Sequence, residues 1–205
     1  DVGIVLIAVW LFGQMNPDGF LFGMGKIYGL LEADPNVQLP AELFVRAEAV
    51  VSAAHLVAVG LLVGALVNPS RPIWLVVITV VVAGLVIRTG AFAMLFAPKN
   101  ALDWVTPGAW RGLTIGIVVL LLASRLSLRV RVSIATFVLI AATILVNVAP
   151  DNPYTAHALQ VWRQGHFLNF HGLTGIVAMA WPFLALAYVI VLMVGTPRAA
   201  RNADD

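Results

Sequence analysis

Residues 76–96, VVITVVVAGLVIRTGAFAMLF, are an almost continuous apolar run in which Arg88 is the only charged side chain. A helix that crosses the hydrocarbon core of a bilayer needs about 20 predominantly apolar residues, so this run has the length of a membrane span. A charged group inside a span is costly unless it meets a partner or water, which makes it a candidate for function. The run therefore predicts that the chain crosses a membrane, and it indicates Arg88 as a candidate functional residue.

The composition of the 205-residue chain indicates an integral membrane protein, with 61% hydrophobic and 11% charged residues. Helices satisfy their own backbone in lipid, and the alternating pattern of a membrane β-strand is missing, so we expect an all-α protein. The chain has no cysteine, which excludes disulfides, thiolate metal sites and thiol catalysis. Its net charge of +2 is too small to indicate a nucleic-acid partner.

Five apolar segments are long enough to predict complete membrane spans. They cover about 43–67, 72–97, 107–124 with its flanks, 128–148 and 173–195. Residues 1–14 are apolar but shorter than a span, and we expect them to be the end of a helix within a longer chain. The expected fold is a polytopic transmembrane helical bundle of about five full spans and one partial span, in a single membrane domain over residues 1–205.

Local signals predict one further helix and one kink. Asn152 and Pro153 are typical of a helix start, and Gly165 is typical of a helix stop, so we expect a short helix along the outer interface. The aromatic and polar stretch HFLNFHGL that follows is typical of interfacial segments. Pro182 lacks the N–H group that a helix interior needs and predicts a kink in the last span.

The charge distribution predicts the orientation of the bundle. Arginines concentrate around residues 125–131 and in the tail after residue 197, whereas most acids fall at the opposite side. The positive-inside rule then places the carboxyl terminus in the cytoplasm and the 14–42, 98–106 and 149–172 connections outside.

Several polar side chains belong to the outer half of the expected spans. Glu48, Ser52 and His55 share one helix face, because their spacings are four and three residues. Glu48 lies at a depth comparable with that of Arg88, which predicts a structural polar pair between neighbouring helices. An ion pair that is purely architectural is one interpretation of this pattern, and an outward-facing polar pocket is the other.

Arginines in this outer half exceed what one architectural pair requires. Guanidinium groups bind phosphate through two parallel hydrogen bonds, so the excess predicts an anionic lipid headgroup as ligand. We expect no metal site at the two histidines of HFLNFHGL, because five residues is a poor spacing for one helix face, and we expect no cofactor. The candidate lipid-binding residues are Arg46, Arg88, Arg111, Arg163, His166, Asn169 and His171.

The sequence contains no nucleophile elbow, no HExxH helix and no Walker-type phosphate loop, so no catalytic residue is predicted. The closing stretch NPYTAHALQVWRQGHFLNFHGLTGIVAMAWPFLALAYV and the opening DVGIVLIAVWLFGQMNP resemble the carboxyl-terminal membrane half of VanZ-like proteins of proteobacteria. The resemblance is sharpest over residues 152–189. It implies a multi-pass protein of the bacterial inner membrane and the cell envelope, and no catalytic residue carries over.

Two functions remain open at this point. The first is binding or handling of an anionic envelope lipid or glycolipid at an outward-facing polar site, with membrane lipids as partners. The alternative is a non-catalytic accessory or structural subunit that packs against other membrane subunits in a larger complex.

Overall fold

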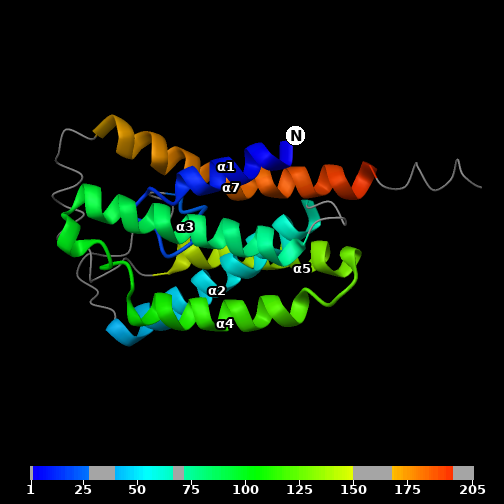
Figure 1. Cartoon of the computed structure of the whole chain (residues 1–205), viewed down its shortest axis with the longest axis horizontal. Coiled ribbons are helices and arrows are strands. Elements are labelled where there is room, and N and C mark those ends of the chain that lie inside the picture. The colour runs from blue at the N-terminus through cyan, green and yellow to red at the C-terminus, as the bar shows by residue number, and fades with distance from the viewer. Residues whose placement is uncertain (1, 28–39, 67–71, 150–167, 196–205) are drawn as a thin grey trace, which may run out of the picture.

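The structure, a computed structural model, describes residues 2–27, 40–66, 72–149 and 168–195 (Figure 1). Regular secondary structure in these ranges is entirely helical, which confirms the all-α class. The elements are α1 Val2–Gly13, α2 Ala41–Leu66, α3 Ile73–Leu95, the 3-10 helix η1 Pro98–Asn100, α4 Pro107–Ala123, α5 Leu128–Val148 and α7 Leu168–Gly195. The interfacial helix expected after Asn152 lies outside the described residues.

Four helices of the described chain are long and apolar enough to cross a membrane: α2, α3, α5 and α7. The fifth expected span corresponds to α4, which begins at the predicted Thr106-Pro107 start but has only 17 residues. At ~1.5 Å per residue its length is about 25 Å, less than the ~30 Å of a typical hydrocarbon core. The chain is therefore a multi-pass membrane protein, and α4 is the short member of the five expected spans.

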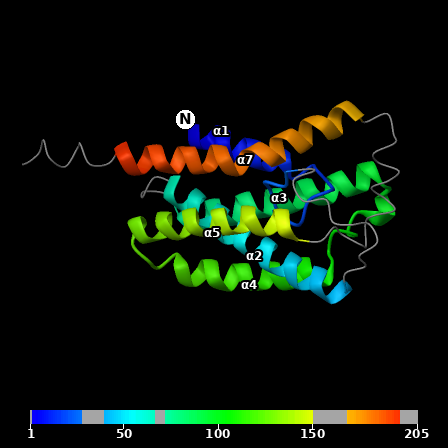
Figure 2. The same ribbon diagram turned by 180° about the vertical axis from the view of Figure 1, so that it is seen from behind.

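Helix α2 lies at the centre of the bundle. It contacts α3, α4 and α5, and most of its side chains are buried. Figures 1 and 2 show α1 and α7 side by side along one edge of the bundle and α4 at the opposite edge. Trp181 joins α7 to α1 by donating a hydrogen bond from Nε1 to the carbonyl of Leu6, 2.9 Å away. The helices around α2 present large apolar side chains outward, as contact with lipid requires.

A stripe of glycines brings α4 against α2. Gly108, Gly112 and Gly116 are four residues apart, so they share one face of α4. A Cβ atom at Gly112 would lie 2.7 Å from the carbonyl oxygen of Ala49 and 2.7 Å from Cβ of Ser52, both on α2. These distances are shorter than carbon atoms tolerate, so only glycine permits this approach of the two helices.

The contacts of the stripe also set the direction of the two helices. Gly108 lies against Glu48, and Gly116, two turns further along α4, lies against Leu56. Both residue numbers rise together, so α2 and α4 are parallel and begin at the same end of the bundle. This geometry places the first turns of α2 and α4 beside each other.

The two ends of the bundle differ in charge. At one end, where α2 and α4 begin, lie all the acids of the described residues: Asp18, Glu42, Glu48 and Asp103. We name it the acidic end. At the other, named the arginine end, the connection between α4 and α5 and the first turn of α5 carry Arg125, Arg129 and Arg131.

Candidate functional site

Residues 14–27, named the buried loop, follow α1 without forming a helix or strand. Many of its side chains are inaccessible to solvent, with Phe22 at 0% exposure and Leu21 and Met24 at 2%. Figure 1 shows this blue segment packed beside α1 and α3. Irregular backbone at membrane depth is tolerated only where protein groups satisfy its N–H and carbonyl groups. The polar side chains of the surrounding spans meet that requirement.

Arg88 binds the first half of the buried loop. Its side chain is 4% exposed, and Nη1 donates a hydrogen bond to the carbonyl oxygen of Asn16 at 2.5 Å. Nη2 donates to the carbonyl oxygens of Pro17, at 3.4 Å, and Gly19. The guanidinium carbon also lies 5.2 Å from the centre of the Phe92 ring. The guanidinium group of Arg88 therefore donates its hydrogen bonds to backbone carbonyl groups within the protein.

His55 binds the second half of the buried loop from the middle of α2. Its ring is fully buried, its Nε2 accepts a hydrogen bond from the Met24 N–H at 3.1 Å, and its Nδ1 lies 3.0 Å from the carbonyl oxygen of Val51. A neutral imidazole with its proton on Nδ1 satisfies both contacts. His55 thus acts as a packing and hydrogen-bonding residue.

Asn147 of α5 fixes the end of the buried loop. Its Nδ2 donates to the carbonyl oxygen of Gly25, and its Oδ1 accepts from the N–H of Ile27, both at 2.7 Å. Gly25 has a φ of 91°, which favours glycine, and a Cβ there would lie 2.9 Å from Thr143. The side-chain amide of Asn147 therefore supplies the hydrogen bonds that a helix or strand would otherwise provide to the backbone of Gly25 and Ile27.

The kink expected at Pro182 provides another partner for the buried loop. Figures 1 and 2 show that α7 bends along its length. Proline has no N–H to donate to the carbonyl four residues earlier, which is that of Ala178. The freed oxygen of Ala178 accepts a hydrogen bond from the N–H of Gly25 at 2.8 Å. The proline that bends α7 thus creates an acceptor for the loop.

Glu48 lies at the amino-terminal end of α4. Its carboxylate accepts a hydrogen bond from the hydroxyl of Thr106, whose oxygen in turn accepts from the N–H of Ala109 at 3.1 Å. A Cβ at Gly108 would clash with this carboxylate, so the glycine gives it room. The partial positive charge of a helix start favours a carboxylate there. Glu48 therefore stabilises α4 from the neighbouring helix.

Glu48 and Arg88 were expected to pair with each other, but each forms its hydrogen bonds with other groups. Glu48 bonds with Thr106, while Arg88 bonds with carbonyl groups of the buried loop. Energetic coupling between them stays a prediction.

Among the described residues, Arg46 and Arg111 are the two exposed arginines at the acidic end. Arg46 forms an ion pair with Glu42 of the same helix, with 2.6 Å between Nη2 and Oε1 and more than two thirds of each side chain exposed. Arg111 makes no hydrogen bond or ion pair with any residue that the structure describes. Both guanidinium groups are available at the surface, in contrast to that of Arg88.

An apolar groove of about 280 Å³ lies between α2, α4 and α5. Its wall includes Val50, Ala54 and Val57 from α2, Ile115 and Val119 from α4, and Val138 from α5. We name it the α2–α4 groove.

The α2–α4 groove is aligned with the two exposed arginines. Arg46 lies four residues before Val50, and Arg111 lies four residues before Ile115, so each arginine is one turn above a groove residue on the same helix face. Because the helices are parallel, both arginines lie at the acidic end of the groove.

The other predicted lipid-binding residues cannot be joined to this arrangement. Arg163 and His166 lie outside the described residues. Asn169 and His171 are in the first turn of α7, but the positions of their side chains are not described. Among the residues that are described, no three His, Asp or Glu side chains are grouped so that they could hold a metal ion.

Sequence reasoning missed the buried loop, the contact of Thr106 with Glu48, and the α2–α4 groove. One sequence signal was available, because the four-residue spacing of Gly108, Gly112 and Gly116 is typical of close helix packing in membranes. Comparison of the chain with protein-family models, with curated proteins and with solved structures finds no match.

Proposed function

We propose that this multi-pass membrane protein binds an anionic envelope lipid at its acidic end. In this proposal Arg111 and Arg46 hold the headgroup, and one acyl chain lies in the α2–α4 groove. The resemblance of residues 152–189 to VanZ-like proteins, and a location in a bacterial inner membrane with the acidic end outside, belong to the same proposal.

The alignment of the groove with the two arginines is the observation that supports this function. Side chains on a helix point toward its amino terminus, so both guanidinium groups extend from the groove toward the membrane interface. A phospholipid has the same order of parts, with an anionic phosphate above apolar chains. Arginine hydrogen-bonds phosphate strongly, and the apolar groove suits a chain rather than a polar solute.

Arg46 and Arg111 differ in how freely they can contact the headgroup. Glu42 neutralises part of the charge of Arg46, although an exposed ion pair of this kind contributes little energy. Arg111 has no such partner among the described residues and lies beside Trp110, which is 62% exposed and suits the membrane interface. Arg111 is therefore the main headgroup contact, and Arg88, bound to the buried loop, is excluded from this site.

The accessory-subunit alternative is favoured by the length and position of α4. This helix is short for a span, lies at an edge of the bundle, and exposes large apolar side chains such as Ile117 and Leu122. A partner subunit could cover that surface. A lipid bound between α2 and α4 would cover only those exposed apolar side chains that lie near the groove.

Native mass spectrometry of protein released from vesicles tests the lipid proposal. The vesicles contain phosphatidylglycerol and phosphatidylcholine in equal amounts, and the measured quantity is phosphatidylglycerol retained per protein. Loss of one charge-assisted contact corresponds to about a tenfold weaker retention, so Arg111→Gln should lose lipid. Ala54→Leu should also lose lipid, because it fills the groove without changing charge.

Two matched controls accompany these variants. Arg125→Gln removes an exposed arginine at the other end, and Ala187→Leu enlarges an exposed alanine of α7, a helix that contributes nothing to the groove wall. Both should retain lipid as the parent protein does. Unchanged retention in Arg111→Gln and Ala54→Leu would refute the site and favour the accessory subunit.

A further inference from the structure

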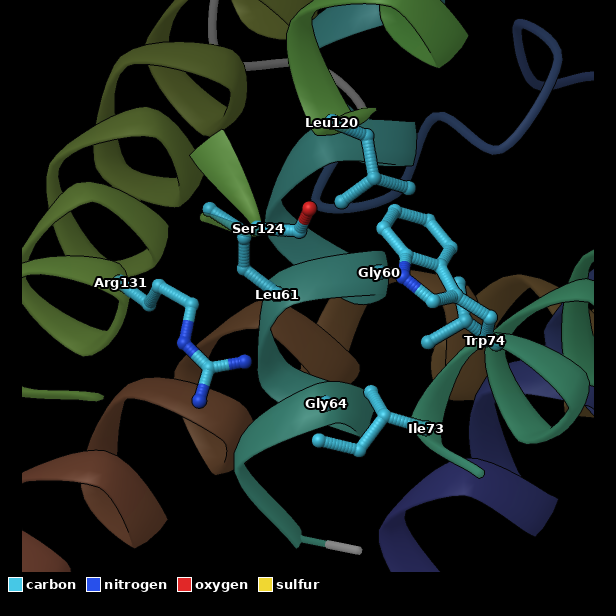
Figure 3. Close-up of a pocket in the computed structure, with 9 residues that line it drawn as sticks. Gly60, Leu61, Gly64, Ile73, Trp74, Leu120, Ser124 and Arg131 are labelled. Atoms are coloured by element: carbon cyan, nitrogen blue, oxygen red, sulfur yellow. The ribbon is translucent and has the colours of Figure 1, made fainter. Parts of the chain in front are cut away.

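A second cavity, of about 240 Å³, opens at the arginine end between α2, α3, α4 and α5 (Figure 3). Its wall is mainly apolar, with Leu61 from α2, Ile73, Trp74 and Val77 from α3, and Leu120 from α4. Its polar groups are the hydroxyl of Ser124, the guanidinium group of Arg131 and the indole N–H of Trp74. We name it the arginine-end cavity.

Gly64 makes room for this cavity. A Cβ atom at Gly64 would lie 3.5 Å from Cγ2 of Ile73 and 3.6 Å from Nη1 of Arg131, which are ordinary contact distances. At Gly60, one turn earlier, a Cβ would clash with Leu120. The helix therefore closes against α4 at Gly60 and leaves space at Gly64, beside the guanidinium group.

Arg131 extends from α5 toward this space, and Figure 3 shows its guanidinium group directed toward Gly64 and Ile73. The side chain is half-buried, and its Nε has no hydrogen-bond partner in the described part of the chain. No ion pair with a described acid neutralises it. A half-buried guanidinium group in this state favours an anion as ligand.

The chain segments that meet at the cavity supply no such anion. The described residues 60–66, 72–77 and 120–131 contain neither Asp nor Glu, whereas they contain three arginines, Arg125, Arg129 and Arg131. The positive charge at Arg131 thus has no acid beside it on the described parts of the helices that form the cavity. Its counter-charge has to come from another molecule or from a distant part of the chain.

The apolar wall identifies the kind of anion. A water molecule occupies about 30 Å³ in the liquid and needs two to four polar partners when buried. The cavity has room for several waters but presents only three polar side chains, those of Trp74, Ser124 and Arg131, and the Ser124 hydroxyl already donates to the carbonyl of Leu121 at 2.7 Å. An apolar chain suits this space better than water or a free inorganic anion does.

We propose that the arginine-end cavity binds an anionic phospholipid of the leaflet at that end, with its phosphate on Arg131 and part of an acyl chain against Leu61, Ile73 and Leu120. Trp74, which is 39% exposed, lies at the mouth at interfacial depth. This site belongs to the opposite leaflet from the α2–α4 groove and does not depend on lipid binding there.

The test uses the full chain in nanodiscs made of phosphatidylcholine with 20% phosphatidylglycerol, followed by native mass spectrometry. Arg131→Gln should reduce phosphatidylglycerol retained at this site about tenfold, which is the effect of one lost charge-assisted contact. Gly64→Leu should reduce it similarly, since its side chain enters the cavity while Arg131 keeps its charge.

Arg129→Gln is the matched control, because it removes an exposed arginine two residues away on the same helix. It should leave retention unchanged. Arg111→Gln separates the two leaflets, since it removes lipid from the groove and leaves the arginine-end cavity occupied. Retention unchanged in Arg131→Gln, or reduced equally in Arg129→Gln, overturns the proposal. Loss in Arg131→Gln with full retention in Gly64→Leu overturns the acyl-chain part and indicates a headgroup bound at the surface.

Discussion

At the scale of single residues, four polar side chains within the spans have internal partners that explain their presence in lipid. Arg88, His55 and Asn147 come from three different helices, and each bonds to backbone atoms of the buried loop. Glu48 instead stabilises the start of α4. Such groups are costly in hydrocarbon, so their persistence is explained by the irregular backbone and helix end that they satisfy.

Replacement of Arg88 by glutamine should destabilise the bundle strongly. The shorter neutral side chain cannot reach all three carbonyls of the buried loop, and each buried polar group left unpaired costs about 1–3 kcal/mol. Thermal unfolding in detergent should therefore show a large decrease for Arg88→Gln. The exposed Arg129→Gln is the control and should unfold at the temperature of the parent. Equal stability of the two variants would show that the carbonyl contacts contribute nothing.

A double-mutant cycle tests the predicted coupling of Glu48 and Arg88. Coupled sites typically deviate from additivity by about 0.5–3 kcal/mol. We expect Glu48→Gln with Arg88→Gln to lose less stability than the sum of the single losses, because each single variant leaves one buried charge without its attraction. The measurement is the free energy of unfolding of the four proteins. Additive losses would show that the two charges act independently.

At the scale of helices, glycine spacing sets the approach of α2 to α4. Gly112→Ala should destabilise the protein, since its Cβ would lie 2.7 Å from the backbone carbonyl of Ala49, which cannot move aside cheaply. Gly90→Ala is the matched control in α3, because a Cβ there meets nothing within 4 Å. Removing that glycine from a helix interior should be neutral or stabilise by about 0.5–1 kcal/mol. Thermal unfolding of both variants gives the comparison, and a Gly112→Ala protein as stable as Gly90→Ala would contradict the packing argument.

Pro182 should have an unusual effect for a proline inside a helix. Proline normally costs a helix about 3 kcal/mol, so replacement by alanine would ordinarily stabilise it. Here the new N–H of Pro182→Ala would compete for the carbonyl of Ala178, which now accepts from Gly25. We expect faster amide hydrogen exchange at residues 24–27 than in the parent. Pro107→Ala, at a helix start remote from the loop, is the control, and unchanged exchange in Pro182→Ala would contradict this role.

Sequence patterns predicted the helices better than the contacts between them. The apolar runs predicted five full spans, of which four have sufficient length in the described chain; Thr106-Pro107 predicted the start of α4, and Pro182 predicted the bend of α7. The buried loop was not predictable in this way, because its shape depends on partners far away in sequence, such as Asn147, 120 residues after Ile27. Likewise, the positions of Arg46 and Arg111 above one groove depend on the register of α2 and α4.

At the scale of the whole molecule, the two ends of the bundle should lie on opposite sides of the membrane. Cysteine labelling is direct in a chain without native cysteine. Positions 99 and 128 are both exposed and lie at the acidic end and the arginine end, respectively. A membrane-impermeant maleimide added to intact cells should label Lys99→Cys and leave Leu128→Cys unlabelled until the cells are opened. The reverse pattern would invert the proposed orientation.

The buried loop also constrains how the protein is made. Its residues leave the ribosome soon after α1, but Asn147 of α5 and the freed carbonyl of Ala178 are synthesised more than a hundred residues later. Backbone groups without these partners are not stable in hydrocarbon. Residues 14–27 therefore stay in water or beside the insertion machinery until α7 has been synthesised. Final assembly therefore follows the synthesis of α7, and it joins α1 to α7, where Trp181 meets Leu6.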